Sequence, residues 1–260
     1  MKRSFLLQSG TTLLELSIAM LIGSIVISGA YKAHEYVSRS TERENEKALI
    51  QRDIIDVTEK LGREIRMAGL GLPGNGIKAE LSDISSDILQ VFSNDTKSKT
   101  QLTSNLSYYN THILVNGITG ANAKGWVCIA GASLDTIYCK ISALGENASG
   151  PDTVYLDGIV GLGVFTVAAT EIYFCSRVLF KIEKSESSVS MVVEKNESSV
   201  KLGGEIDTLN ITLNNSSGTV LTGGFENTAV ITVFTGGYVG DGQNRTLVSE
   251  SIDVNVRNLN

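Results

Sequence analysis

The stretch Thr11–Ala30, TTLLELSIAMLIGSIVISGA, decides how this 260-residue chain is organised. Its twenty residues contain a single charge, Glu15, and ten residues, MKRSFLLQSG, precede it. At about 1.5 Å per residue, a helix of this length matches the roughly 30 Å hydrocarbon core of a bilayer. We therefore predict a membrane-spanning helix over residues 11–30.

Charges around this stretch predict its orientation. Lys2 and Arg3 precede it, and the next Lys or Arg is Lys32. Positive residues favour the cytoplasmic side, so the N-terminus is expected inside and the remainder of the chain outside. A cleaved secretory signal peptide is the alternative, but its apolar core runs for only about 7–15 residues. Here the apolar run is longer and continues into a helical pattern.

Glu15 is an unusual residue for an apolar helix. An acidic side chain costs about 2.5–3.5 kcal/mol at the bilayer centre on insertion scales, and such residues are usually functional. One interpretation is that the carboxylate reaches the headgroups from a shallow position. The other is that it pairs with a cation, which cleavage after Gly10 would create as the α-amino group of Thr11. Two staggered helices would then pair the amine of one with the carboxylate of the other.

The run Gly10–Glu15, GTTLLE, with a short basic leader before it and an apolar stretch after it, resembles the class III signal of type IV pilins and pseudopilins. That family usually has Phe or Met after the Gly, where this chain has Thr11. The resemblance implies that residues 1–10 are a leader, removed between Gly10 and Thr11 by prepilin peptidase, and that Thr11 is then N-methylated. It also implies that the helix packs into a filament core, with Glu15 guiding subunit docking.

Beyond residue 30 the helical pattern continues to residue 68. Residues 31–47 are strongly polar and contain no Pro or Gly, which indicates a solvated neck. An apolar stripe then recurs every three or four residues, which is typical of an amphipathic helix lying on a sheet. Its members are Ile50, Ile54, Val57, Leu61, Ile65 and Ala68, and the opposite face carries Arg52, Asp56, Glu59, Arg63 and Arg66. The glycines and Pro73 in residues 69–76 predict the helix end.

Two further segments resemble one particular group within this family. The helix end Gly62–Gly69, GREIRMAG, is similar to that of PilW-type minor pilins, and the tail Val254–Asn258, VNVRN, is similar to their C-terminal strand. Pseudopilins of the J class in type II secretion have a similar helix end and are the alternative. The resemblance covers the first 70 residues and the tail only.

Residues 69–260 read as a β-rich head of short apolar runs separated by Ser, Asn, Gly and Asp. We predict strands at Ile88–Phe92, Thr111–Val115, Gly125–Ile129, Thr136–Ile141, Thr153–Leu156, Gly163–Val167, Ile172–Lys184, Val189–Val193, Leu209–Leu213, Ala229–Phe234 and Leu247–Val256. The expected fold is α+β, the pilin-like lollipop in which one long N-terminal helix packs on an antiparallel sheet. The size of the head predicts an inserted β-rich part, which is most separable over residues 105–150.

The three cysteines lie in this head, which the orientation above places where disulfides persist. Cys128 and Cys139 flank a segment with the composition of a hairpin connection, and a bridge between them would stabilise the fold by about 2–4 kcal/mol. We predict this bridge, with Cys175 as a buried free thiol. Pairing of Cys139 with Cys175 is the alternative.

Several classes of function are disfavoured. A formal net charge of −6 argues against nucleic-acid binding, and two histidines and three cysteines leave little material for a metal site. The chain shows neither a CxxC pair nor a nucleophile elbow, and residues 240–244, GDGQN, read better as a turn than as a calcium loop. We expect no enzymatic activity, no catalytic residues, no metal and no cofactor.

The expected function is that of a minor pilin, a subunit that primes or caps type IV pilus assembly near the filament tip. The resemblance implies prepilin peptidase, other minor and major pilins and the pilus assembly platform as partners. It also implies a single-pass inner-membrane precursor whose head is periplasmic and, after assembly, lies at the cell surface. A J-class pseudopilin and a tip adhesin are the alternatives.

Overall fold

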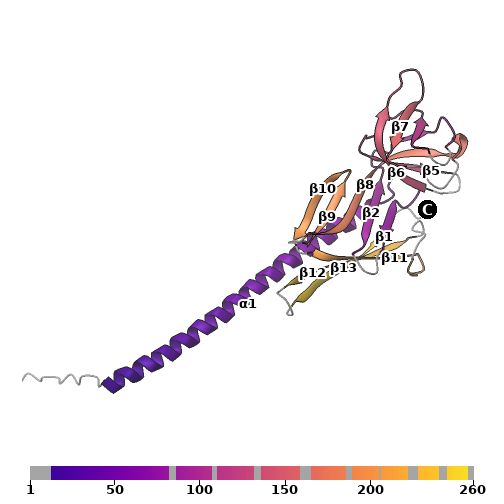
Figure 1. The fold of residues 1–260 in the computed structure, drawn as a ribbon. Coiled ribbons are helices and arrows are strands. Elements are labelled where there is room, and N and C mark those ends of the chain that lie inside the picture. Colours follow the sequence, from indigo (N-terminus) through magenta and orange to yellow (C-terminus); the bar gives the residue numbers. More distant parts are fainter. Residues whose placement is uncertain are drawn as a thin grey trace, which may run out of the picture. The chain divides into compact units, whose positions relative to one another are not determined.

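The computed structural model describes residues 13–81, 86–106, 110–131, 136–158, 165–185, 189–204, 206–221, 228–239 and 245–256. The chain divides into two compact units, residues 1–48 and 49–260, which are described separately. One helix, α1 (Leu13–Met67), runs from the first unit into the second, and all the strands belong to the second (Figure 1). The layout is α+β, as predicted.

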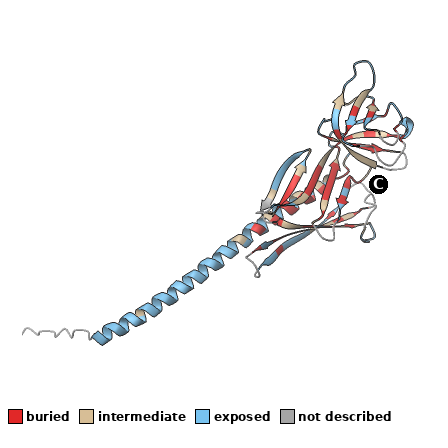
Figure 2. Cartoon of the chain, in the orientation of Figure 1, coloured by how far each residue is buried: buried red, intermediate tan, exposed pale blue. Residues whose placement is uncertain are grey.

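The described residues of the first unit, 13–48, are helical throughout and contain no buried side chain (Figure 2). The apolar stretch therefore forms a helix without any support from the rest of the fold. Neither of the two prolines lies in α1, so no missing N–H interrupts its hydrogen bonds. The predicted neck, residues 31–47, is a continuous part of this helix.

The C-terminal part of α1, residues 49–67, has one buried and one exposed face. All six residues of the predicted stripe are at most 4% exposed, and all five residues of the predicted polar face are exposed. The stripe packs against strands of two sheets in the main hydrophobic core. The amphipathic prediction is confirmed, and the end of the helix falls where the glycines predict it.

Ten strands form the larger sheet, and every pairing in it is antiparallel. These are β1 (Ile77–Glu80), β2 (Ile88–Ser93), β3 (Lys99–Gln101), β4 (His112–Val115), β5 (Trp126–Ala130), β6 (Thr136–Gly145), β7 (Asp152–Leu156), β8 (Glu171–Lys184), β9 (Val189–Lys195) and β10 (Ser198–Gly204). The main path runs β1-β2-β8-β5-β6-β7-β4, with β3 and β9 also paired to β8, and β10 paired to β9.

The smaller sheet consists of β11 (Ile206–Asn214), β12 (Val230–Val239) and β13 (Thr246–Asn255), with β12 in the middle. It packs close to α1 at Gly62, where a Cβ atom would lie 3.2 Å from the Ile252 Cδ1. The absence of a side chain at this position lets the helix approach β13. The two sheets and the helix enclose the main core.

The 14-residue strand β8 joins two parts of the head. Its first half pairs with β3 and β5, and its second half pairs with β2 and β9. Val178 and Phe180, in the second half of β8, belong to the main core. A second hydrophobic core consists of apolar side chains from residues 102–174. The second core draws on residues 102–174, a wider range than the inserted part predicted over residues 105–150, because β7 and β8 complete its sheet. Residues 49–260 form one compact unit, so this part is not a separate one.

Two glycines shape the segment after the helix. Gly69 and Gly76 have φ angles of +70° and +66°. Residues that carry a Cβ atom rarely adopt such positive angles. A Cβ at Gly76 would also lie 2.3 Å from the Phe92 carbonyl oxygen and from the Gly69 nitrogen. The chain can therefore turn from α1 toward the sheet here only because both residues are glycine.

Ten of the eleven predicted strands are present, with ends shifted by a few residues. The exception is Gly163–Val167, where Phe165 forms only an isolated bridge with Leu106 and a 3-10 turn begins at Val167; residues 163 and 164 lie outside the described residues. The short strands β1, β3 and β10 were not predicted. Their polar or glycine-rich sequences carry little β signal, and strand pairing to β2, β8 and β9 imposes their extended conformation.

A buried hydrogen bond links α1 to β12. The hydroxyl oxygens of Thr58 and Thr235 lie 2.8 Å apart, and the two residues are 4% and 0% exposed. Thr58→Val should lower the free energy of unfolding by about 1–3 kcal/mol, because it leaves the Thr235 hydroxyl buried without its partner. Thermal unfolding followed by circular dichroism measures the loss. Adding Thr235→Val should recover part of it, and a double variant that loses the full sum of both single effects would contradict this account.

Candidate functional site

The exposed apolar surface of α1 is the most distinctive chemical feature of the chain. Among the described residues, α1 is the one helix whose length and composition would allow it to cross a membrane. Ten large apolar side chains between residues 13 and 27 are each at least half exposed: Leu13, Leu14, Leu16, Ile18, Met20, Leu21, Ile22, Ile25, Val26 and Ile27. A contiguous surface of this kind requires lipid or a protein partner to cover it.

Glu15 lies in the first turn of α1 and is the only charged residue between Leu13 and Tyr31. A carboxylate near a helix N-terminus is favoured by the helix dipole. The predicted cleavage and methylation positions, Gly10 and Thr11, lie outside the described residues. Of the three predicted N-terminal site residues, only Glu15 is among the described residues, and it lies at the start of the apolar segment.

The neck that follows, residues 31–47, is rich in polar side chains, and all its residues are exposed except Glu46, which is half-buried. Its Arg39 pairs with Glu35 at 2.6 Å, one helical turn away, and such exposed pairs add only a few tenths of a kcal/mol. The neck thus keeps its helical form from local hydrogen bonds and separates the apolar segment from the amphipathic part of α1 along the chain.

The predicted Cys128–Cys139 disulfide does not form, and all three cysteines are free thiols. The β5–β6 register pairs Cys128 with Tyr138 and Val127 with Cys139. Because successive residues of a strand point to opposite faces, Cys128 and Cys139 lie on opposite faces of the sheet. The sequence spacing suggested a hairpin closed by a bridge, but the spacing does not reveal which face each residue takes.

The alternative pairing of Cys139 with Cys175 meets the same obstacle. Cys175 is paired with Trp126 on β5, and Trp126 shares a face with Cys128 two residues later. Cys175 therefore faces the same side as Cys128, away from Cys139. Both Cys128 and Cys175 are buried, at 0% and 7% exposure.

Cys128 and Cys175 belong to a third hydrophobic cluster, which we call the aromatic–thiol cluster. Its members are Leu72, Phe92, Trp126, Cys128, Tyr138, Tyr173 and Cys175. The Phe92 and Tyr138 rings stack with centroids 4.1 Å apart, and the Arg177 guanidinium lies 4.6 Å from the centre of the Trp126 ring. Arg177 also pairs with Glu194 on β9. Aromatic and cation–π contacts of this kind hold β2, β5, β6 and β8 together.

Burial controls the ionisation of the thiols. Desolvation raises the pKa of Cys128 to about 12, although a hydrogen bond with Tyr138 opposes the shift. Desolvation likewise raises the pKa of Cys139 to about 11, and it raises the pKa of Cys175 well above its usual value, with Cys128 adding to the shift. All three side chains are neutral thiols at neutral pH. Such thiols pack as small apolar groups and exchange slowly.

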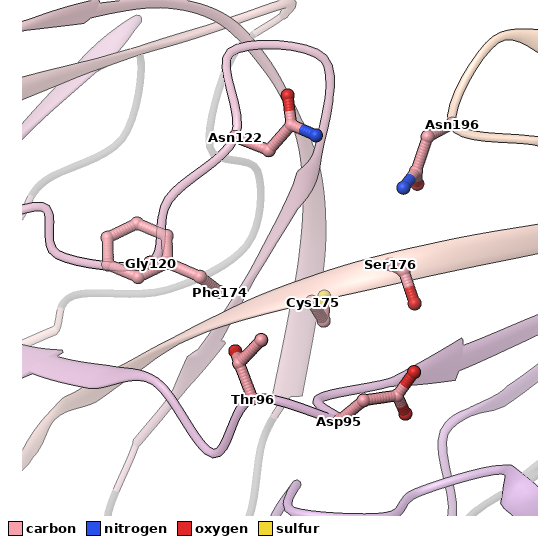
Figure 3. A pocket seen from close by; sticks show the side chains of 8 residues that line it. All are labelled: Asp95, Thr96, Gly120, Asn122, Phe174, Cys175, Ser176 and Asn196. Atoms are coloured by element: carbon pink, nitrogen blue, oxygen red, sulfur yellow. The ribbon is translucent and has the colours of Figure 1, made fainter.

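A polar pocket of about 210 Å³ lies beside β8, and Cys175 is one of the residues that line it (Figure 3). Its lining comes from four segments that are distant in sequence: Asp95 and Thr96, Gly120 and Asn122, Phe174 to Ser176, and Asn196. The amide oxygens of Asn122 and Asn196 each accept a backbone N–H, from Lys124 and Arg177 respectively, which holds these side chains in place. The sequence carried no local signal for this pocket, because only the sheet brings the four segments together.

Other chemistry is sparse in the part of the chain that the structure describes. No three His, Cys, Asp or Glu side chains lie close enough together to hold a metal ion. His34 lies on the exposed neck, and His112 lies on β4 beside Tyr155. The loop at residues 240–244 lies outside the described residues.

No protein-family model, no curated protein and no solved structure matches this chain. The physical features of α1 and the head therefore carry the functional argument.

Proposed function

We propose that this protein is a minor pilin of a type IV pilus, made as a membrane-bound precursor and built into the filament by its N-terminal helix. The proposal rests on one observation: α1 consists of an uncovered apolar part and a part that packs into the head. Residues 13–30 form an apolar helix that the fold leaves uncovered, whereas residues 49–67 are fixed into the core of a β-rich head. A subunit built in this way exchanges lipid for neighbouring helices when it leaves the membrane.

The basic leader and the Gly10–Glu15 run support processing by a prepilin peptidase. Removal of residues 1–10 would place a new amino group four residues before Glu15, one helical turn away. An amine and a carboxylate on staggered helices attract each other strongly once both are out of water. This pairing would align each incoming subunit with the one before it.

The head supports a place at the filament tip. It contains two hydrophobic cores, and the second core is built largely from strands β4 to β7, which contribute nothing to the core around α1. Bulk of this kind is easier to accommodate at an end than along a helical shaft. Imaging of tagged protein along sheared filaments tests this placement, because label distributed over the whole length would exclude the tip.

The intact mass of the protein tests the class. Protein from cells with prepilin peptidase should lack the ten leader residues, and protein from cells without the enzyme should keep them. N-methylation of Thr11 should add about 14 Da to the processed form. Gly10→Val should leave the leader attached even when the enzyme is present, while Ser9→Ala serves as a neighbouring control that should be processed.

Two results would overturn the proposal: the full mass in peptidase-containing cells, or cleavage near Ala30. Cleavage near Ala30 would identify the apolar segment as a secretory signal. Processing after Gly10 without incorporation into pili, but with dependence on a type II secretion system, would favour the J-class pseudopilin. A head that binds surfaces at the tip would add the adhesin function to the minor-pilin one.

A further inference from the structure

We infer that the pocket of about 210 Å³ binds a single neutral sugar ring, held between the amides of Asn122 and Asn196 and the carboxylate of Asp95. Two observations carry the inference: the strand pairing that creates the pocket, and the hydrogen-bonding groups that are fixed around it. The binding depends on the head alone. That the head meets glycans outside the cell rests on the proposed function.

The pocket lies where β8 changes its partners on both edges. On one edge the pairing with β3 ends at Tyr173, and the pairing with β2 begins at Ser176. On the other edge the pairing with β5 ends at Cys175, and the pairing with β9 begins at Val178. The loops at the ends of these four strands therefore meet around residues 174–176. Loops that converge on a rigid sheet are a common location for binding sites.

The loop that carries Asp95 and Thr96 is held in place by a buried amide. Asn94 is 1% exposed, and its side-chain nitrogen donates to the Ser98 carbonyl oxygen at 2.9 Å. Its side-chain oxygen accepts the Ser98 N–H at 3.1 Å and the Thr96 hydroxyl at 3.2 Å. A Cβ at Gly120 would lie 2.0 Å from the Ser98 Oγ, so only glycine lets the loop before β5 approach this closely. The pocket is therefore formed before a ligand arrives, which lowers the entropic cost of binding.

The two asparagines of the pocket have oriented amides. The Asn122 Oδ1 accepts the Lys124 N–H at 3.0 Å. The Asn196 Oδ1 accepts the Arg177 N–H at 3.1 Å, and the Asn196 N–H donates to the Arg177 carbonyl oxygen at 3.3 Å. These bonds identify the other branch of each amide as the NH₂ group, which is a hydrogen-bond donor. Figure 3 shows both amides on one side of β8, with the Asn122 nitrogen directed toward Asn196.

The lining also offers hydrogen-bond acceptors. Asp95 is exposed, and its ionised carboxylate can only accept hydrogen bonds, whereas the hydroxyls of Thr96 and Ser176 can accept and donate. In the view of Figure 3, Asp95 and Thr96 lie on the other side of β8 from the two asparagines. A ligand hydroxyl can accept from an amide NH₂ group and donate to a carboxylate at the same time. A sugar ring carries several such hydroxyls and therefore matches this lining.

The same lining disfavours charged ligands. None of its described residues is Lys, Arg or His, so an anion would face the Asp95 carboxylate without a compensating charge. A hard cation such as Ca²⁺ takes about six to eight oxygen ligands, and the amide oxygens of Asn122 and Asn196 are already bonded to backbone N–H groups. The volume of the pocket lies below the roughly 300–1,000 Å³ of sites for drug-sized ligands, so it suits one ring.

Saturation-transfer NMR on the full chain, in a detergent without a sugar headgroup, tests the inference. The neutral probes are glucose, galactose, mannose and N-acetylglucosamine, and glucuronic acid is the charged comparison. At least one neutral sugar should bind with a millimolar Kd, as a ligand of this size allows. Glucuronic acid should show no transfer, because its carboxylate meets that of Asp95.

Asn122→Asp and Asn196→Asp keep the oxygen that accepts the backbone N–H and delete the NH₂ donors. Each should weaken sugar binding by about 3–10-fold, which is the value of one hydrogen bond. Asn147→Asp is the matched control, because the Asn147 Oδ1 accepts the N–H two residues further on, as that of Asn122 does, and Asn147 does not line this pocket. Its binding should equal that of the wild type. Circular dichroism checks that each variant is folded.

Asp95→Asn, on an exposed loop, is a second variant that leaves the turns at both asparagines intact and should also weaken binding. The absence of transfer to all four neutral sugars would overturn the inference, as would a preference for glucuronic acid. Equal binding by Asn122→Asp and Asn147→Asp would do the same, because the sugar would then bind elsewhere. An uncleaved protein that binds a neutral sugar would contradict only the proposed function, and a processed pilin that binds none would contradict only this inference.

Discussion

Replacing Leu61 with alanine should lower the free energy of unfolding of the head by about 2–5 kcal/mol. Leu61 lies in the middle of the buried stripe of α1, is 0% exposed and belongs to the core enclosed by the helix and the two sheets. Removing its three terminal carbons deletes buried apolar surface and leaves a cavity that β-strands on either side cannot easily close. A loss of this size consumes a large part of the stability of a typical domain.

Ile55→Ala is the matched control, because Ile55 is on the same helix six residues away and is 52% exposed. Its truncation should cost well under 1 kcal/mol. Both variants are compared with the wild type by thermal unfolding of the full chain in detergent, followed by circular dichroism and by Trp126 fluorescence. Equal shifts for Leu61→Ala and Ile55→Ala would show that the helix does not hold the sheets together.

Glu15→Ala should abolish incorporation of the protein into filaments while leaving its head folded and its leader removable. The substitution removes the single charge of the apolar segment, and with it the proposed partner of the new amino terminus. Glu15 is exposed and belongs to none of the hydrophobic cores, so the unfolding temperature should not change. The measurement is the fraction of the protein recovered in sheared pili, with the unprocessed fraction determined in parallel.

Glu35→Ala provides the control for this substitution. Glu35 is an exposed glutamate of the neck that pairs only with Arg39 among the ion pairs of the described residues, and its loss should cost a few tenths of a kcal/mol. Filaments should therefore contain Glu35→Ala at the wild-type level. If Glu15→Ala were also recovered at that level, the carboxylate would be a group that merely reaches the lipid headgroups, and its docking role would be excluded.

The sequence by itself determined the long helix, its polar and apolar faces and most of the strands, because these follow from local periodicity and from glycine and proline. The stripe from Ile50 to Ala68 was readable since a helix places every third or fourth residue on one side. Glu15 could also be singled out from the sequence, because it is the single charge in an apolar run and no tertiary contact is needed to recognise it.

Only the tertiary structure decided which residues meet across strands. The spacing of eleven residues between Cys128 and Cys139 predicts a bridged hairpin, but a shift of one residue in register puts a side chain on the other face of a sheet. The same register places Cys128 and Cys175 on one face of the sheet, and the sheet brings Asn122 and Asn196 to one pocket. Long-range pairing depends on the packing of the whole head, and no local pattern encodes it.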